Sequence, residues 1–217
     1  MPNVCVLISG CGFLDGAEVH ESVLSLLYLA QSGATYVVAA PHKQQMHVVN
    51  HHTGEVATGE TRMVHEEAAR IARGAVLDLG EVDVASFDAL MIPGGFGAAK
   101  NLCDFAINGS QATIEPSVAK LIQDFHQAQK PIGAVCIAPA VLALALKKGV
   151  VTIGNDAETA QKINKLGVLH ENKEVTDTVV DAEHKIVTAP AYMYGEASIA
   201  QVAQGIEKTV QALVSMC

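Results

Sequence analysis

Short apolar runs alternate along the first two thirds of the chain with stretches whose apolar residues recur at helical spacing. Such runs are typical of buried parallel strands, because both faces of these strands are covered. The runs span residues 3–10, 35–41, 87–95 and 131–135, and helical patterns occupy residues 15–34, 61–74, 98–106 and 116–129. This alternation predicts an α/β protein with a mostly parallel sheet covered on both faces.

The pattern changes toward the C-terminus. Residues 174–190 contain two runs rich in β-branched side chains, joined by the polar residues 181–185, which predicts an antiparallel hairpin. Residues 195–216 have the spacing of a long amphipathic helix. Because no linker or repeat interrupts these elements, we expect residues 1–217 to form a single domain.

Residues 15–34 have a clear helical pattern. Asp15 is a candidate N-cap that Glu18 would complete as a capping box, and Gly33 would end the helix. The predicted apolar stripe consists of Val19, Val23, Leu26, Leu27 and Ala30.

Composition and charge narrow the range of functions. The 14 basic and 23 acidic residues give a formal net charge of -9, which disfavours nucleic acid and anionic lipid as partners. The longest uncharged apolar run, residues 131–146, is shorter than a membrane span and contains Gly133 and Pro139. The first residues lack a signal-peptide pattern. These observations predict a cytoplasmic protein that has no nucleic acid or membrane partner.

Five cysteines without a C-x-x-C pair indicate neither a disulfide framework nor a zinc ribbon. Cys5 lies in a strand pattern, Cys103 in a helical one, and Cys217 is the last residue. Packing or chain-end roles are the simplest interpretation of these three.

Three predicted strand-to-helix turns are candidate binding loops, because ligands of open α/β sheets bind at the carboxyl ends of strands. The turn at residues 9–16 lacks the G-x-G-x-x-G spacing of a dinucleotide loop, and residues 93–100 lack the spacing of a P-loop. Gly94 and Gly95 in the second turn can instead present bare backbone N–H groups to a ligand.

The third turn contains Cys136, placed between an apolar strand and an apolar helix. A thiol at the start of a helix is favoured as thiolate by the helix dipole and by free N–H groups. The N–H groups of Ile137 and Gly95 are candidates to stabilise an oxyanion. Two alternatives remain open: Cys136 is a packing residue, or Cys11, which also follows a strand, is the reactive thiol.

Proton transfer at a reactive thiol requires an acid or base. Glu21 lies one turn into the first predicted helix, where partial burial would raise its pKa toward neutrality. His20 beside it is a secondary candidate. The histidines crowded between His42 and His65 lack the spacing of a helical zinc site, so we expect no metal centre.

Several sequence blocks together resemble the isoprenoid biosynthesis glyoxalase (ElbB) group of the ThiJ/PfpI-like branch of the class I glutamine amidotransferase-like superfamily. The blocks are SGCG, DGAEVHE, NHHTGE, IPGGFGAAKNL, CIAPA and TAPAYM, which extend from residue 9 to residue 193. The resemblance implies a flavodoxin-like three-layer α/β sandwich, with Cys136 as nucleophile and Glu21 as its acidic partner. It also implies a homodimer and no cofactor. Relatives with a catalytic histidine carry it where this chain has Asn155, which argues against protease and amidase chemistry.

The resemblance implies a glutathione-independent glyoxalase that converts small dicarbonyls such as glyoxal to hydroxy acids through a Cys136 hemithioacetal. Two alternatives remain open. One is a protein in which Cys136 senses oxidants, and the other is a metabolite-binding protein with little turnover.

Overall fold

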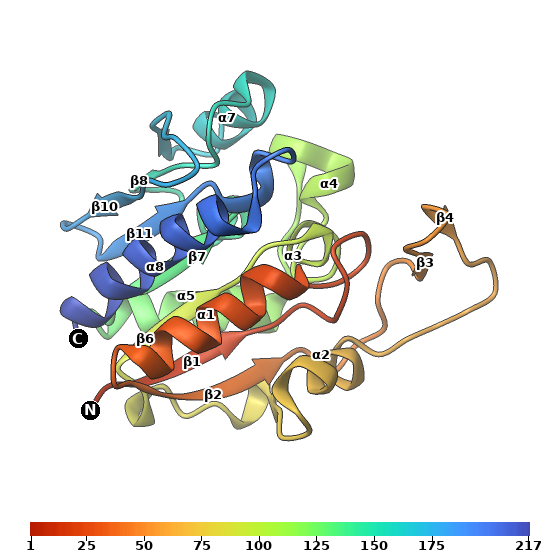
Figure 1. Ribbon diagram of the computed structural model, residues 1–217, viewed down its shortest axis with the longest axis horizontal. Coiled ribbons are helices and arrows are strands. Elements are labelled where there is room, and N and C mark those ends of the chain that lie inside the picture. The colour runs from red at the N-terminus through yellow and green to blue at the C-terminus, as the bar shows by residue number, and fades with distance from the viewer.

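The computed structural model describes all residues, 1–217, and has a seven-stranded sheet at its centre, in the order β10-β11-β7-β6-β1-β2-β5 (Figure 1). Its strands are β1 (Asn3–Leu7), β2 (Thr35–Ala40), β5 (Leu77–Asp78), β6 (Ala89–Ile92), β7 (Ile132–Val135), β10 (Val179–Asp181) and β11 (Ile186–Ala189). Strands β10 and β11 pair antiparallel, and all other neighbours pair parallel. The predicted α/β fold, with a mostly parallel sheet and a hairpin in the C-terminal half, is confirmed.

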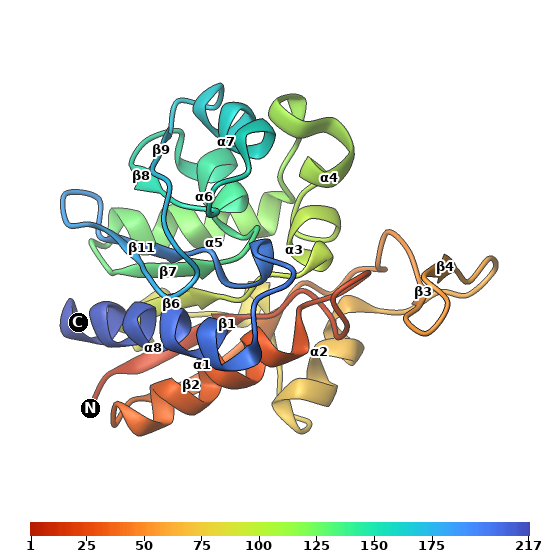
Figure 2. The same cartoon turned by 45° about the horizontal axis from the view of Figure 1, so that its top comes forward.

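Helices cover both faces of this sheet (Figure 2). They are α1 (Val19–Gln31), α2 (Val64–Ala72), α3 (Phe96–Lys100), α4 (Phe105–Asn108), α5 (Pro116–Gln127), α6 (Pro139–Leu146), α7 (Ala157–Asn164) and α8 (Ile199–Ser215). Helices α1 and α8 pack against each other on one face, and α5 and α6 pack against each other on the opposite face.

The sheet separates two hydrophobic cores, and β1 contributes to both. Val4 and Val6 belong to the core beneath α1 and α8, whereas Cys5 and Leu7 belong to the core on the side of α5 and α6. This division follows from the period-two alternation of side chains along a strand. The thiol of Cys5 is therefore a packing group, and its burial raises its pKa to about 12.

Four adjacent parallel strands, β11, β7, β6 and β1, end along one edge of the sheet. The segments that follow them are residues 190–194, 136–138, 93–95 and 8–18. A short 3-10 turn, Ala191–Met193, begins just after β11. The topology thus brings four chain segments, distant in sequence, to one end of the molecule.

The start of α1 differs from the prediction. Glu18 is itself the N-cap, and its side chain accepts a hydrogen bond from the backbone N–H of Glu21 at 2.7 Å. The Asp15 carboxylate instead accepts a hydrogen bond from the backbone N–H of Val49 at 2.7 Å. The predicted capping box is wrong because a partner distant in the sequence occupies Asp15.

The predicted apolar stripe of α1 is also largely wrong. Val19, Val23 and Leu27 are exposed, and the buried face of the helix carries Glu21, Ser22, Ser25, Leu26 and Leu29. Only Leu26 of the predicted stripe is buried.

The helix predicted over residues 98–106 is broken. Helix α3 ends at Lys100 and α4 begins at Phe105, and between them Cys103 forms an isolated antiparallel bridge with Ile114. The Cys103 thiol donates a hydrogen bond to the carbonyl of Ala98 and is buried. The prediction that Cys103 is helical is wrong, although its role as a packing residue fits its burial.

A projecting arm, residues 43–63, extends from one side of the molecule and carries the two-stranded sheet of β3 (Val49–Asn50) and β4 (Glu55–Val56) (Figure 1). Its base is closed by a hydrogen bond from the Gln45 N–H to the Arg62 carbonyl. A second small sheet, β8 (Val150–Val151) with β9 (Leu169–His170), lies beside α7. None of the helices combines the length and apolarity needed to cross a lipid bilayer.

Candidate active site

Cys136 occupies the first position after β7, in a backbone conformation that L-amino acids seldom adopt. Its φ is 61°, in the left-handed region, and its backbone N–H donates to the carbonyl of Ala189 at 2.9 Å. Helix α6 begins three residues later, at Pro139. Such strain is found preferentially at functional sites, where the surrounding structure holds it in place. The predicted sharp turn at Cys136 is present.

Glu21 meets Cys136 from the buried face of α1. Its side chain has no solvent exposure, and burial, together with its charge, raises the pKa of the neighbouring Cys136 thiol. The carboxyl group also accepts hydrogen bonds from the N–H of Gly94, at 2.9 Å, and from the N–H of Tyr192, at 3.1 Å. Three of the four segments at this edge of the sheet therefore converge on one carboxyl group.

Gly94 permits this close approach. A β-carbon at this position would lie 2.4 Å from the Cys136 Cβ and 2.7 Å from the Glu21 Oε2. Any side chain at residue 94 would thus force the thiol and the carboxyl group apart. The sequence suggested that the Gly94 N–H could bind a substrate oxygen. In the structure this N–H donates to Glu21 and is not free for a ligand.

The N–H groups of Gly95 and Ile137 face the Cys136 sulfur and act to lower the pKa of the thiol. Gly95 has a φ of 89°, a conformation that glycine adopts without strain. These two groups come from different turns and are placed to stabilise negative charge beside the sulfur.

Burial and mutual repulsion shift the acidity of the thiol and the carboxyl group. Desolvation, assisted by the charge of Glu18, raises the pKa of Glu21 to about 7. Desolvation, followed by the charge of Glu21, raises the pKa of the Cys136 thiol, and these effects outweigh the two N–H groups. The sequence predicted a low thiol pKa from the helix dipole and free N–H groups, but burial opposes both. At neutral pH Glu21 is placed to accept a proton from the thiol.

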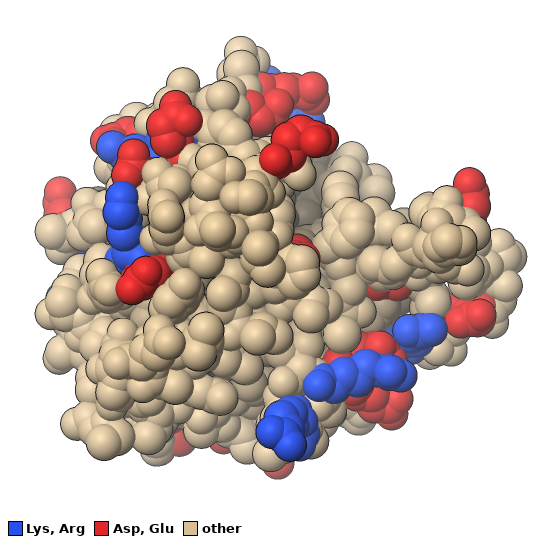
Figure 3. Space-filling model, in the orientation of Figure 1, with Lys and Arg blue, Asp and Glu red and all other residues tan.

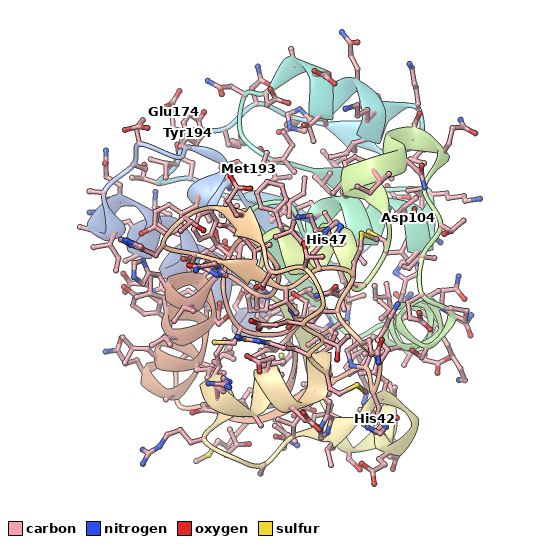
Figure 4. The ribbon with its side chains drawn as sticks, turned by 90° about the vertical axis from the view of Figure 1, so that its right-hand side faces the viewer. His42, His47, Asp104, Glu174, Met193 and Tyr194 are labelled. Atoms are coloured by element: carbon pink, nitrogen blue, oxygen red, sulfur yellow. The ribbon has the colours of Figure 1, made fainter.

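A cavity of about 450 Å³ opens over Cys136. It lies between the segments after β1, β6, β7 and β11 on one side and helices α4 and α7 on the other. In Figure 4, Met193, which lines the cavity, and Asp104, which precedes α4, lie on opposite sides of this end of the molecule. A larger hollow, of about 730 Å³, lies between residues 82–85 and the segment around Asp124 and Lys130, before β6 and β7 begin, and its lining contains no cysteine or histidine.

The secondary candidates are not at the sulfur. His20 is exposed on α1, and its Nδ1 lies 3.0 Å from the Tyr192 hydroxyl. Asn155 is exposed in the turn before α7, outside the cavity lining. Cys11 is half-buried, also outside the lining, and burial raises its pKa. Of the three, only His20 connects to the site, through Tyr192.

Tyr192 is the functional candidate that sequence reasoning missed. It lines the cavity, its N–H holds Glu21, and its hydroxyl contacts His20. The signal that could have found it is its position directly after a predicted strand that ends at the same sheet edge as the strand before Cys136.

The histidines do not converge on one point. No group of three or more His, Cys, Asp or Glu side chains lies close enough to hold a metal ion. His42 and His47 lie well apart in Figure 4. His51 instead packs edge-on against Phe13 and accepts a hydrogen bond from the N–H of Leu14.

The family model that matches this chain is the DJ-1/PfpI family, over residues 11–202. The chain belongs to the DJ-1/PfpI family. A crystal structure of an isoprenoid biosynthesis protein with an amidotransferase-like domain from Ehrlichia chaffeensis matches with a TM-score of 0.94 and 38% identity, covering 100% of this chain and 99% of that one. The predicted resemblance to the ElbB group and the flavodoxin-like fold are thereby confirmed.

Two curated relatives match the DJ-1/PfpI chain along nearly all of its length. The human glutamine amidotransferase-like class 1 domain-containing protein 3, mitochondrial, is 41% identical, over 99% of this chain and 83% of its own length. The rat ES1 protein homolog, mitochondrial, is 40% identical, over 99% of this chain and 84% of its own length.

The prediction of a cytoplasmic protein is wrong on this finding. Both relatives carry a mitochondrial designation in their names. The prediction rested on net charge, hydropathy and the lack of a signal-peptide pattern. Net charge and hydropathy determine which partners a surface attracts rather than the compartment.

Proposed function

We propose that this member of the DJ-1/PfpI family is a cofactor-independent glyoxalase that acts on dicarbonyls through Cys136. The observation that carries the proposal is the strained Cys136, which lies beside the buried Glu21 beneath a cavity. A thiol can attack a carbonyl carbon, and a neighbouring carboxyl group with a pKa of about 7 can accept the thiol proton and return it to the substrate.

The reaction begins when the Cys136 sulfur attacks an aldehyde carbon and its proton passes to the Glu21 carboxylate. The N–H groups of Gly95 and Ile137 stabilise the oxyanion, which takes the proton back from Glu21 to give a hemithioacetal. No oxidant or reductant is required up to this point.

Glu21 then removes the hydrogen from the attacked carbon and returns it to the neighbouring carbon, while the hydroxyl proton moves to the neighbouring oxygen. One carbon is oxidised to a thioester and the other is reduced to an alcohol, so electrons balance within the substrate. Water cleaves the thioester, which converts glyoxal to glycolate and restores the thiol.

The test is turnover of glyoxal to glycolate by wild type, Cys136→Ser and Cys136→Ala. We expect both variants to lose at least about a hundredfold in kcat/KM, because each removes the thiol nucleophile. Cys11→Ser is the matched control, since Cys11 lies outside the cavity, and it should retain wild-type turnover. Full activity in Cys136→Ser would overturn the proposal.

The same preparations separate the two other functions that the sequence left open. An oxidant sensor would show negligible glyoxal turnover and conversion of Cys136 to sulfinate by peroxide, read by mass spectrometry. A metabolite-binding protein would show neither reaction. Glyoxal turnover that depends on Cys136 excludes both as the main function.

We also propose that the chain forms a homodimer through the outer face of α1. Val19, Val23 and Leu27 lie on successive turns of this helix and are exposed, and the surface over α1 is largely free of charged side chains (Figure 3). Contiguous apolar surface of this kind is typical of protein interfaces.

Sedimentation of the wild type and of Val23→Asp tests this dimer. We expect a dimeric wild type and a monomeric variant, because the new charge would be buried at the interface. Val180→Asp, at a valine of similar exposure on β10, should remain dimeric. A wild type that is monomeric across the micromolar range would contradict the proposal.

A further inference from the structure

The cavity over Cys136 is much larger than glyoxal. Its volume of about 450 Å³ falls within the range of roughly 300–1,000 Å³ that encloses whole organic ligands. Glyoxal consists of only two carbons and two oxygens, and would leave most of this space filled with water. The size of the cavity therefore calls for a substrate with more atoms beyond its reacting carbons.

The walls of the cavity are mainly apolar away from the thiol. Besides Cys136 and Tyr192, seven of the fourteen lining residues are hydrophobic, among them Phe105 of α4, Ile137 and Met193. The polar residues Glu18 and Tyr192 are both hydrogen-bonded to Glu21 and so belong to the reacting end. Apart from Thr159 and Lys162 on α7, the polar lining residues thus lie near Cys136, and an apolar compartment extends from it.

Two aromatic rings mark this compartment. Phe13 and Phe96 both line the cavity and are 47% and 46% exposed. Their backbones are adjacent, since the Phe96 N–H donates to the Phe13 carbonyl at 2.7 Å. Phenylalanine rings are normally buried, and rings left open beside a cavity can pack against an apolar ligand.

The one positive charge in the cavity lining is already paired. Lys162, on α7, is the only basic residue in the lining, and its Nζ lies 2.6 Å from the carboxylate of Glu158. Glu18 and the buried Glu21 add negative charge near the thiol. A carboxylate or phosphate on the substrate would be repelled there, so the remainder of the substrate is neutral.

From size, lining and charge together we infer that the substrate is a 2-oxoaldehyde whose keto carbon bears a neutral apolar arm, aryl or branched alkyl, that fills this compartment. The inference rests on the proposed function for its chemistry. Cys136 attacks the aldehyde carbon, the same internal hydrogen transfer forms the thioester, and water releases a 2-hydroxy acid. For phenylglyoxal the product is mandelate.

The experiment compares kcat/KM for glyoxal, methylglyoxal and phenylglyoxal. An apolar group that gains a matching pocket contributes a factor of roughly 10–200, so phenylglyoxal should exceed glyoxal by at least about tenfold. Glyoxal turned over as efficiently as phenylglyoxal would overturn the inference and leave the proposed function in place.

Variants on α4 test whether the preference for phenylglyoxal arises in the apolar compartment. Ala106 lines the cavity and is exposed, so Ala106→Phe would narrow the compartment without disturbing a core. We expect the phenylglyoxal-to-glyoxal ratio of kcat/KM to fall by about tenfold. Ile107→Phe is the matched control, because Ile107 is 63% exposed and outside the lining, and it should keep the wild-type ratio. An unchanged ratio in Ala106→Phe would contradict the location.

A binding measurement distinguishes failure of the inference from failure of the proposed function. Acetophenone carries the apolar arm without the aldehyde, and its binding to wild type and Ala106→Phe can be followed by calorimetry. If no dicarbonyl is turned over, the proposed function fails. In that case, if acetophenone binds the wild type and Ala106→Phe weakens the binding, the site for an apolar arm is still supported. If acetophenone does not bind, the inference of such a site is overturned.

Discussion

The two faces of α1 reverse the usual distribution of residues. The buried face carries Glu21, Ser22 and Ser25, and the solvent face carries Val23 and Leu27. The serines are satisfied locally: Ser25 Oγ donates to the Glu21 carbonyl, and Ser22 Oγ to the Glu18 carbonyl, both at 2.7 Å. Such bonds reduce the free-energy cost of burying a hydroxyl group. The small serine side chains also let α8 pack closely against α1.

Burial on α1 is therefore determined by which residues face Cys136 and α8, and not by the spacing of apolar residues in the sequence. Glu21 is buried where α1 meets Cys136, and two backbone N–H groups hold its carboxyl group there. The apolar residues on the other face are exposed and belong to the proposed dimer surface. Two pairs of variants and one change of pH test this contrast between the two faces.

The largest effect is expected for Glu21→Gln. The amide keeps the size of the carboxyl group but cannot accept the thiol proton, and loss of a general base costs about 10²- to 10⁴-fold. The measurement is kcat/KM for dicarbonyl turnover, with circular dichroism to verify folding. Glu18→Gln is a less drastic comparison, because Glu18 caps the helix without contacting the sulfur. Activity in Glu21→Gln within a few fold of wild type would mean that burial of Glu21 is purely structural.

The next effect compares two leucines on opposite faces. Leu29 is fully buried and Leu27 is 45% exposed, so Leu29→Ala should lower the free energy of unfolding by about 2–5 kcal/mol. Leu27→Ala should change it by less than about 0.5 kcal/mol in the monomer. Urea denaturation at low protein concentration measures both. Equal costs for the two would show that the outer face is covered in the folded chain.

The third effect is the pH dependence of stability. Glu21 has an ordinary pKa of 4.5 and a folded-state pKa of about 7, so the folded chain retains a proton that the unfolded chain has lost between these values. Stability therefore falls as pH rises from about 4.5 to 7, by roughly 3 kcal/mol.

Denaturant titrations at pH 5 and pH 7.5, in wild type and Glu21→Gln, isolate this contribution. The decrease should be smaller in the variant by the amount assigned to Glu21, because the amide does not titrate. An identical decrease in both proteins would mean that other groups cause it and that the pKa of Glu21 is not raised.

Much of the scaffold follows from local pattern. The apolar runs that became β1, β2, β6 and β7 are continuous, and the hairpin of β10 and β11 has its polar turn between two β-branched runs. The turn at Cys136 could also be placed, because an apolar strand and an apolar helix meet there. These features depend on neighbours in the sequence.

What sequence missed depends on distant contacts. Asp15 is taken by Val49 of the arm, Cys103 pairs with Ile114, and Tyr192 reaches Glu21 across 171 positions. The acidity of Cys136 was misjudged for the same reason, because desolvation by the packed fold outweighs the local N–H groups. The spacing of apolar residues along the chain contains no information about such distant partners.

The left-handed backbone at Cys136 places function and foldability in conflict. A side chain in that region costs of order 1–3 kcal/mol, and glycine would relieve the strain. Cys136→Gly would relieve this strain and, on the proposed function, would also remove the nucleophile, so one substitution should raise stability and abolish turnover.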